Sequence, residues 1–516
     1  MKAHEGRTWT RFDRAGLVLI VLLATALALY NLDGYPALTS MDEGHKLQFP
    51  KNLVSYGRYA LRTFEGFSPF GGGTGSGAVN TGVTLMLPVA LAFRILGVNL
   101  WAARLPVAMY LIGASGALYL CVRSLYGGRV ALLAYLLFLL AGPPWLNTMF
   151  FGRSVYGEVP ALAFFFLGSY LWFRSLDDKG PALLIAASIC FGLASLTKDV
   201  FAPMLTALFG GMYVLDRMKS RHLQLRQVVL PVVASAASVI GWRLLLGDIG
   251  GAREAENSLW DGIRLRFLVF SPHLSYESLK FLAEHGAILW IIPSLVHVLI
   301  VAFRSGDSKA TIRCLFHPLF VMIWFSWYVL ASIGWHRYAY PGWAVASIPV
   351  AKFLCDLARA FRVSIPGPPV ALRWREPPAK LHRAPALLLI GILVIWPAQN
   401  SVRRIIKGDN DAPDEFAQYI EANVPQDALI ASEEWEIDFF SNRSYFHHPG
   451  RFGTALIKHQ LGHPLTERYD VSVYDPDYVV DGPYGRGTTL ISREFLESRC
   501  RLVVSIGDYD LYQVTQ

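Results

Sequence analysis

Three carboxylates lie beside apolar runs, close to where a membrane surface would make a charge costly to desolvate. Asp42 and Glu43 are adjacent in the first polar segment after the first apolar run, and Glu158 begins a later run. Such carboxylates need a partner or a purpose, and one purpose is to orient a hydroxyl and accept its proton. The alternative is a solvated acidic loop, with Glu158 at a helix N-terminus that favours negative charge.

Basic and aromatic side chains occupy similar positions. The candidates, each in a short polar segment, are Arg153, Lys198, His336, Arg337 and Tyr338. Cations at an interface can hold a lipid-linked phosphate and stabilise the charge that grows on it as it leaves. The alternatives are snorkelling basic side chains and an aromatic belt, which accounts for Tyr338 but not for Arg337.

Apolar helices must position these residues. The chain is 53% hydrophobic and only 17% charged, with a mean hydropathy of +0.36, whereas soluble domains carry about 25% charge. Several apolar runs have the roughly 17–25 residues that cross a bilayer. The net charge of +8 comes from basic clusters between these runs, which is typical of cytoplasmic loops and argues against a nucleic-acid partner.

The basic clusters also orient the chain. Basic residues before the first run place the N-terminus in the cytoplasm, and this run is expected to be a retained signal-anchor. The later basic loops all become cytoplasmic only if 80–97 is a re-entrant or interfacial helix rather than a full crossing. We therefore expect an α-helical polytopic membrane protein with about 11 crossings, whose segments 33–102 and 400–516 face outward.

The C-terminal part has a different composition. An amphipathic helix is expected at Asp414–Asn423, followed by strands at Asp427–Ser432, Tyr478–Val480 and Leu502–Ile506. This alternation predicts a small α/β domain. The expected division is therefore a transmembrane domain over 1–399 and a periplasmic α/β domain over 400–516.

The order and spacing of the charged segments resemble the membrane-embedded GT-C glycosyltransferases. The similar branch contains the protein O-mannosyltransferases and the lipid A aminoarabinose transferase. The positions that resemble the family's landmarks are Asp42-Glu43, Leu96–Pro106, Glu158, Thr197-Lys198 and Arg337-Tyr338. The resemblance implies a GT-C fold and an inverting transfer of sugar from a polyprenyl-phosphate donor to a protein, lipid or glycan.

The resemblance also implies roles for the candidate residues. Asp42 would be the catalytic base and Glu43 would position the acceptor or a cation, although the two could exchange roles. Lys198 and Arg337 would hold the donor phosphate. The residues expected to shape this substrate-binding site are Arg153, Glu158, His336 and Tyr338. Relatives differ in their need for a divalent ion, and no metal or other cofactor is expected here because the sequence has no evident ligand cage.

Three departures from the family pattern are visible. Asn80-Thr81-Gly82 stands where many relatives have His-Pro-Pro or Lys-Pro, Glu158 where Asp is more usual, and Asp199 where Gly is usual. These changes affect the expected phosphate contacts, so no particular sugar is carried over from the family.

The alternatives to a transferase are a transporter or flippase, a scaffold and a membrane glycan polymerase. A transporter or flippase for lipid-linked sugars would place polar residues within the spans near the bilayer midplane. A scaffold would leave the charged outer segments unexplained. A membrane glycan polymerase, using a diphosphate-linked donor, is the nearest alternative. The expected location is the bacterial inner membrane, in contact with membrane lipid, with the site on the periplasmic side.

Overall fold

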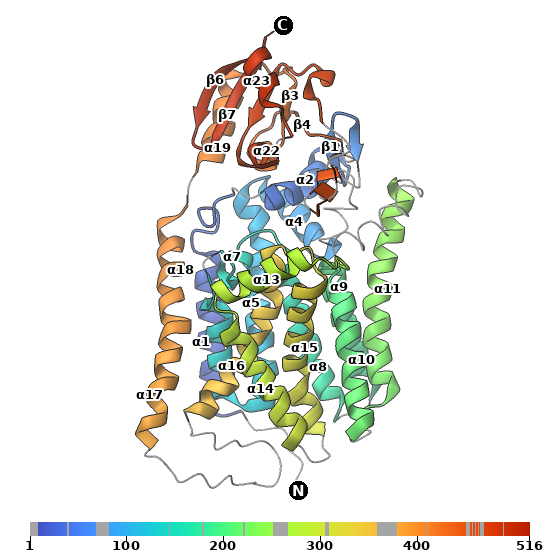
Figure 1. The fold of residues 1–516 in the computed structure, drawn as a ribbon, viewed down its shortest axis with the longest axis vertical. Helices are drawn as coiled ribbons and strands as arrows, with labels where there is room; N and C mark the ends of the chain where they lie inside the picture. The colour runs from blue at the N-terminus through green and yellow to red at the C-terminus, as the bar shows by residue number, and fades with distance from the viewer. Residues whose placement is uncertain are drawn as a thin grey trace.

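A computed structural model gives the arrangement of the chain (Figure 1). It describes residues 9–38, 41–68, 82–143, 145–177, 180–219, 222–250, 267–304, 309–358, 379–409, 411–449, 469–488 and 490–515, together with some residues between 452 and 464. A long helical bundle carries a sheet domain at one end, and α2 (Met41–Tyr56), α4 (Val83–Leu96) and β1 (Leu61–Thr63) lie between the two. β1 pairs with β2 (Gly66–Ser68) in a short antiparallel hairpin.

The bundle is built from helices that pack around one apolar core. Its helices are α1 (Arg11–Leu29), α5 (Leu100–Tyr126), α6 (Gly128–Leu140), α7 (Thr148–Phe151), α8 (Glu158–Ser175), α9 (Pro181–Thr197), α10 (Phe201–Lys219), α11 (Leu225–Gly250), α13 (Pro272–Glu284), α14 (Ile288–Arg304), α15 (Lys309–Ala331) and α16 (Tyr340–Leu357). After them, α17 (Ala379–Ile390), the π-helix η2 (Gly391–Ile395) and α18 (Trp396–Lys407) run along the bundle to the sheet domain.

The helices have the lengths and surfaces of membrane spans. In the described part of the chain, 5 helices are long and apolar enough to cross a membrane, or up to 6 if the bent pair α13 and α14 counts as one span. Large apolar side chains are exposed on them, including Leu22, Val233 and Ile292, and such surfaces are stable in lipid rather than in water. The polytopic character is thus confirmed, whereas about 11 crossings stays a prediction.

The segment expected not to cross forms α4. This helix has 14 residues, which span about 21 Å, less than the ~30 Å hydrocarbon core. The length of α4 agrees with an interfacial or re-entrant helix.

Asn99 caps the following helix, α5, since its side chain accepts a hydrogen bond of 2.8 Å from the Ala102 N–H. Between α5 and α6 the chain turns at Gly127, whose φ of 92° favours glycine.

The C-terminal part contains a five-stranded mixed sheet in the order β4-β3-β5-β7-β6. The strands are β3 (Ile430–Ser432), β4 (Tyr445–Phe446), β5 (Tyr478–Asp481), β6 (Cys500–Ile506) and β7 (Tyr509–Val514). β3 is parallel to β4 and β5, whereas β7 is antiparallel to β5 and β6. The accompanying helices are α19 (Ala412–Asn423), α20 (Trp435–Phe440), α22 (Pro483–Thr488) and α23 (Arg493–Arg499).

Three strands and one helix of this domain coincide with the sequence expectation, and β4 and β7 were missed. The expected boundary between 399 and 400 falls inside α18, because that helix continues from the apolar run into the polar linker. The division into domains stays a prediction.

Candidate active site

The first turn of α2 carries both members of the carboxylate pair. A helix N-terminus favours negative charge because its backbone N–H groups are unpaired there. Glu43 is buried, and its oxygens accept hydrogen bonds of 3.0 and 2.9 Å from Arg104 of α5. The Val155 N–H donates a third at 2.7 Å. Glu43 is therefore fully engaged by the protein itself.

Arg104 also contacts the segment that leads into α2. Its remaining nitrogen donates to the carbonyl oxygens of Pro36 at 2.7 Å and Leu32 at 3.2 Å. Arg104 is completely buried, so its charge relies on Glu43 and these carbonyls. Sequence reasoning included Arg104 in the run Leu96–Pro106 without giving it a role. A charged residue inside an apolar run was the signal that could have identified it.

Asp42 has a different environment from Glu43. It forms an ion pair with Arg337, which lies in the 3-10 helix η1 (His336–Ala339) before α16. The Asp42 side chain is 42% exposed and that of Arg337 17%. Arg337 also lies over the rings of Trp335, at 4.7 Å, and Tyr338, at 5.6 Å. Asp42 is therefore the member of the carboxylate pair that an acceptor from solvent can reach.

A second ion pair also lies near Tyr338. Lys198, the residue that caps the end of α9, is 2.7 Å from the carboxylate of Glu158, the first residue of α8, and both side chains are buried. The Lys198 ammonium is 5.7 Å from the Tyr338 ring centroid. Lys198 and Arg337 thus lie 5.7 and 5.6 Å from the Tyr338 ring centroid. The fold brings together five of the predicted site residues from four separate segments.

Lys46 is a further cation at this site that sequence reasoning missed. It lies one turn after Asp42 on α2, so both project from one face of the helix. Its side chain is buried, and its ammonium is 4.1 Å from the ring centroid of Tyr156. A lysine four residues after a candidate base was the available signal.

Arg153, which was expected to shape the substrate-binding site, is engaged by backbone carbonyl groups. Arg153 is completely buried. Its guanidinium donates to the carbonyl oxygens of Leu27, Ala28, Tyr30, Asn31 and Tyr35. A guanidinium has five N–H donors, so none remains for a ligand. Arg153 instead closes the C-terminal end of α1 and holds the loop that leads to α2.

His336 makes aromatic contacts with other parts of the bundle. Its ring stacks on Phe281 of α13, with a centroid distance of 4.0 Å and an interplanar angle of 5°. It also lies 5.7 Å from the ring of Trp145. These contacts anchor η1 to α13, and they place Arg337 rather than His336 beside Asp42.

Gly82, the last residue of the segment in which the sequence departs from the family pattern, packs near Lys198. Asn80 and Thr81 are outside the described residues, but the Gly82 N–H donates to the Thr197 carbonyl at 3.2 Å. A Cβ atom at Gly82 would lie only 1.6 Å from the Leu196 carbonyl oxygen. A proline at 82 could neither donate this hydrogen bond nor fit. Glycine therefore allows this segment to pack against the end of α9.

Metal ligands are not grouped at the site. Among the described residues, no three His, Cys, Asp or Glu side chains are arranged to hold a metal ion. The expectation of no cofactor stays a prediction.

Part of the chain matches known proteins in sequence. Residues 85–242 match the family model described as dolichyl-phosphate-mannose-protein mannosyltransferase. An uncharacterized protein of Aquifex aeolicus (strain VF5) is 26% identical over 212 residues, which is 40% of this chain and 39% of that protein. The match thus spans well under half of the relative's length.

Solved structures match over nearly the whole chain. ArnT from Cupriavidus metallidurans, bound to undecaprenyl phosphate, has a TM-score of 0.62 and 16% identity, covering 96% of this chain and 98% of that one. The archaeal oligosaccharyltransferase AglB from Archaeoglobus fulgidus, in complex with an inhibitory peptide and a dolichol-phosphate, has a TM-score of 0.54 and 14% identity, covering 98% and 74%. The resemblance indicated by the sequence is therefore confirmed: the chain has the fold of the GT-C membrane glycosyltransferases.

Proposed function

We propose that this chain is an inverting glycosyltransferase that moves a sugar from a polyprenyl-phosphate donor to an acceptor hydroxyl. The observation that carries the proposal is the solvent-accessible Asp42 paired with Arg337, next to the buried pair of Lys198 and Glu158. Glu158, Lys198 and Arg337 lie at the ends of apolar helices, where the phosphate of a membrane-bound donor would also lie.

The proposed reaction needs one base and a site for the leaving phosphate. The acceptor hydroxyl oxygen attacks the anomeric carbon, the bond from that carbon to the phosphate oxygen breaks, and Asp42 takes the hydroxyl proton. The electron pair stays on the phosphate, where Arg337 and Lys198 stabilise the charge. A phosphate leaving group needs little protonation, so a second carboxylic acid of the glycosidase kind is unnecessary.

The ion pairs suggest how the donor enters. Arg337 and Lys198 are each engaged by a carboxylate in the protein alone. A donor phosphate would take over the contact of Arg337 with Asp42, and this would release the Asp42 carboxylate for the acceptor. Glu158 is buried and would continue to hold Lys198 in place.

Two of the remaining predicted residues, Glu43 and Arg153, receive positioning roles. Glu43 is held by Arg104 and the Val155 N–H, so it fixes the first turn of α2 and thereby Asp42. Arg153 fixes the loop between α1 and α2 through its carbonyl contacts. Neither would touch the substrates.

The relatives support a lipid-phosphate donor. The matching family model is described by a dolichyl-phosphate-mannose donor, and the two solved structures hold undecaprenyl phosphate and a dolichol-phosphate. The name of the matching family points to a protein acceptor, but the family model covers only residues 85–242 of this chain. The proposed acceptor is therefore kept as a protein, lipid or glycan. We place the reaction at the periplasmic face of a bacterial inner membrane, following the distribution of basic loops.

A transfer assay with purified protein tests this function. Mass spectrometry of envelope glycans and glycolipids in a deletion strain first identifies the acceptor. Detergent-purified protein is then incubated with this acceptor and either synthetic polyprenyl-phosphate sugars or the matching polyprenyl-diphosphate sugars. Transfer from the monophosphate donors is expected. Transfer from the diphosphate donors alone would replace this proposal with the glycan polymerase.

A further inference from the structure

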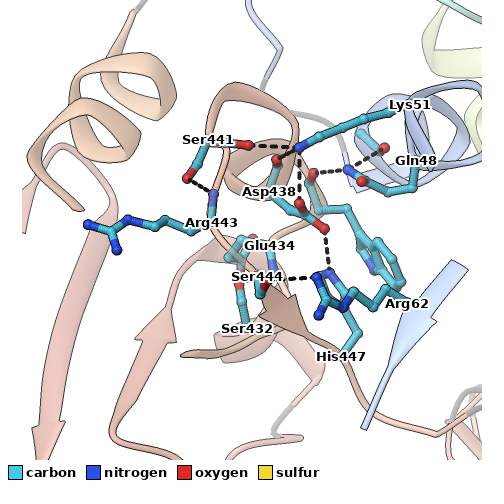
Figure 2. A network of polar contacts seen from close by, with 12 residues as sticks. Gln48, Lys51, Arg62, Ser432, Glu434, Asp438, Ser441, Arg443, Ser444 and His447 are labelled. Atoms are coloured by element: carbon cyan, nitrogen blue, oxygen red, sulfur yellow. Dashed lines mark hydrogen bonds and ion pairs between the residues drawn. The ribbon is translucent and has the colours of Figure 1, made fainter. Parts of the chain in front are cut away.

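Helix α2 belongs both to the candidate site and to the contact with the C-terminal domain. Its first turn carries Asp42, and the helix packs against α20. Figure 2 shows Gln48 and Lys51 projecting from this helix toward the segment that contains Asp438 and Ser441. A displacement of the C-terminal domain would therefore displace the helix that carries the proposed base.

The closest approach is at Gly44, two residues after Asp42. A Cβ atom at Gly44 would lie 2.6 Å from the Glu436 backbone nitrogen and 2.7 Å from the Trp435 carbonyl carbon. The neighbouring His45 places its ring against Trp435, with centroids 4.8 Å apart and an interplanar angle of 88°. The backbone of the C-terminal domain thus touches the first turns of α2 directly.

Lys51 makes a second contact with the C-terminal domain, further along α2. Its ammonium donates to the Ser441 carbonyl at 2.8 Å, to the Asp438 carboxylate at 3.2 Å and to the Asp438 carbonyl oxygen. An ammonium has three donors, and all are used here. Gln48 adds a hydrogen bond of 3.1 Å to the Trp435 carbonyl. The buried Lys51 side chain therefore joins α2 to the C-terminal end of α20.

The partner of Lys51 is itself held in place. His447 lies 3.2 Å from the other oxygen of Asp438, and its ring stacks on Trp435 at a centroid distance of 3.4 Å. Burial raises the pKa of the Asp438 carboxyl, but the Lys51 charge and the His447 hydrogen bond outweigh burial, so the pKa lies below its usual value. Asp438 is therefore ionised at neutral pH, and the ion pair persists.

We propose that Lys51 is a positioning residue for sugar transfer, which sets Asp42 by fastening α2 to the C-terminal domain. The inference rests on the proposed function, because it assigns Lys51 an effect on the proposed base. Lys51 lies about 14 Å from Asp42 along the helix, so it acts through α2 and not on the substrates. The alternative is that Lys51 stabilises the fold and has no separate effect on transfer.

Steady-state kinetics separate these two roles. We expect Lys51→Ala to lower kcat by about 10²-fold, because a displacement of about 1 Å in a reacting group can have that effect. The dissociation constant for the donor should not change, since Lys51 is remote from Arg337 and Lys198. Lys51→Arg keeps the charge and should restore part of kcat. The matched control is Lys458→Ala, an exposed lysine of the C-terminal domain, which should behave as wild type.

A double-mutant cycle gives the decisive readout. If Lys51 acts through Asp42, Lys51→Ala should have no further effect in an Asp42→Asn background, because the positioned group is already absent. If the two losses multiply, Lys51 acts independently of Asp42, and the inference is overturned. A purely structural role would lower the yield and thermal stability of Lys51→Ala while its folded fraction kept wild-type kcat.

Gly44→Ala tests the same contact without removing a charge. Alanine favours the helix, but its Cβ cannot fit against the Glu436 backbone, so the C-terminal segment must move away. We expect kcat to fall and the helix to remain. Wild-type kcat in both Gly44→Ala and Lys51→Ala would overturn the inference, even if Lys51→Ala alone folds poorly. Wild-type kcat in Asp42→Asn would instead overturn the proposed function.

Discussion

Arg104 holds both carboxylate oxygens of Glu43 at 3.0 and 2.9 Å inside the protein, whereas the adjacent Asp42 remains 42% exposed. The two neighbouring carboxylates therefore do different work. Glu43 joins α2 to α5 and is removed from solvent, while Asp42 is left where an acceptor can approach. The proposal that Asp42 is the base rests on this difference in accessibility.

Arg104→Ala should destabilise the protein strongly, because it leaves Glu43 as an unpaired buried charge. Breaking a buried pair in this way costs about 3–5 kcal/mol. Thermal unfolding in detergent measures the effect, with the exposed Arg94→Ala as control. Glu43→Gln/Arg104→Met should be less destabilised than Arg104→Ala alone. Equal stability of Arg104→Ala and wild type would contradict the structural role of the pair.

Asp42→Asn should lower turnover by about 10²–10⁴-fold, the usual contribution of a general base. The amide keeps the size of the side chain but cannot accept the proton, so donor binding should survive. Sugar transfer from a synthetic polyprenyl-phosphate donor measures the loss, and the exposed Asp508→Asn is the control. If Asp42 were only a solvated loop residue, the effect would stay within about 0.5 kcal/mol.

Arg337→Ala and Lys198→Ala should each weaken donor binding by about 1.5–3 kcal/mol, because each removes a charge-assisted contact to phosphate. This corresponds to roughly 10–150-fold in the dissociation constant. Arg337→Lys and Lys198→Arg should keep part of the affinity. Titration with the labelled donor measures binding, and the exposed Arg58→Ala is the control. Unchanged affinity in both folded alanine variants would remove the phosphate assignment.

Gly82→Ala should disturb the end of α9, because its Cβ would collide with the Leu196 carbonyl at 1.6 Å. The shift reaches Lys198 two residues later, so both the unfolding temperature and the donor affinity should fall. Gly113→Ala is the matched control, since it lies in α5 with nothing within 4 Å of its Cβ. That substitution should be neutral or stabilising by up to about 1 kcal/mol. Similar behaviour of the two variants would argue against the tight contact at 82.

The stability of the C-terminal domain should decline from pH 5 to pH 8. Burial, reinforced by the charge of Glu436, raises the pKa of the Glu434 carboxyl from 4.5 to about 8. Between these values the native state keeps a proton that the unfolded chain has lost, so its stability falls as the pH rises through this window. Thermal unfolding across the range measures the decline. Glu434→Gln, which cannot ionise, should flatten it, and an unchanged slope would contradict the assignment.

Much of the class and part of the site followed from the sequence. Composition and the lengths of apolar runs predicted a polytopic membrane protein, because lipid requires long apolar helices. The resemblance of the segments around Asp42, Lys198 and Arg337 to a known family implied the GT-C fold, and the expected helix and three strands of the C-terminal domain lie at their predicted places. These features depend on local patterns along the chain.

The division of labour among the charged residues required the tertiary structure. Asp42 and Glu43 are neighbours of the same chemical kind, so only the contact with Arg104, 61 positions away, separates their roles. The positioning role proposed for Arg153 follows from five carbonyl groups at the end of α1 and in the loop after it, all far from Arg153 in the sequence. The positioning role proposed for Lys51 depends on its contact with Asp438, which lies 387 positions later in the chain. Local patterns predict which residues carry charge, but burial and partner choice depend on contacts between distant segments, and those exist only in the folded chain.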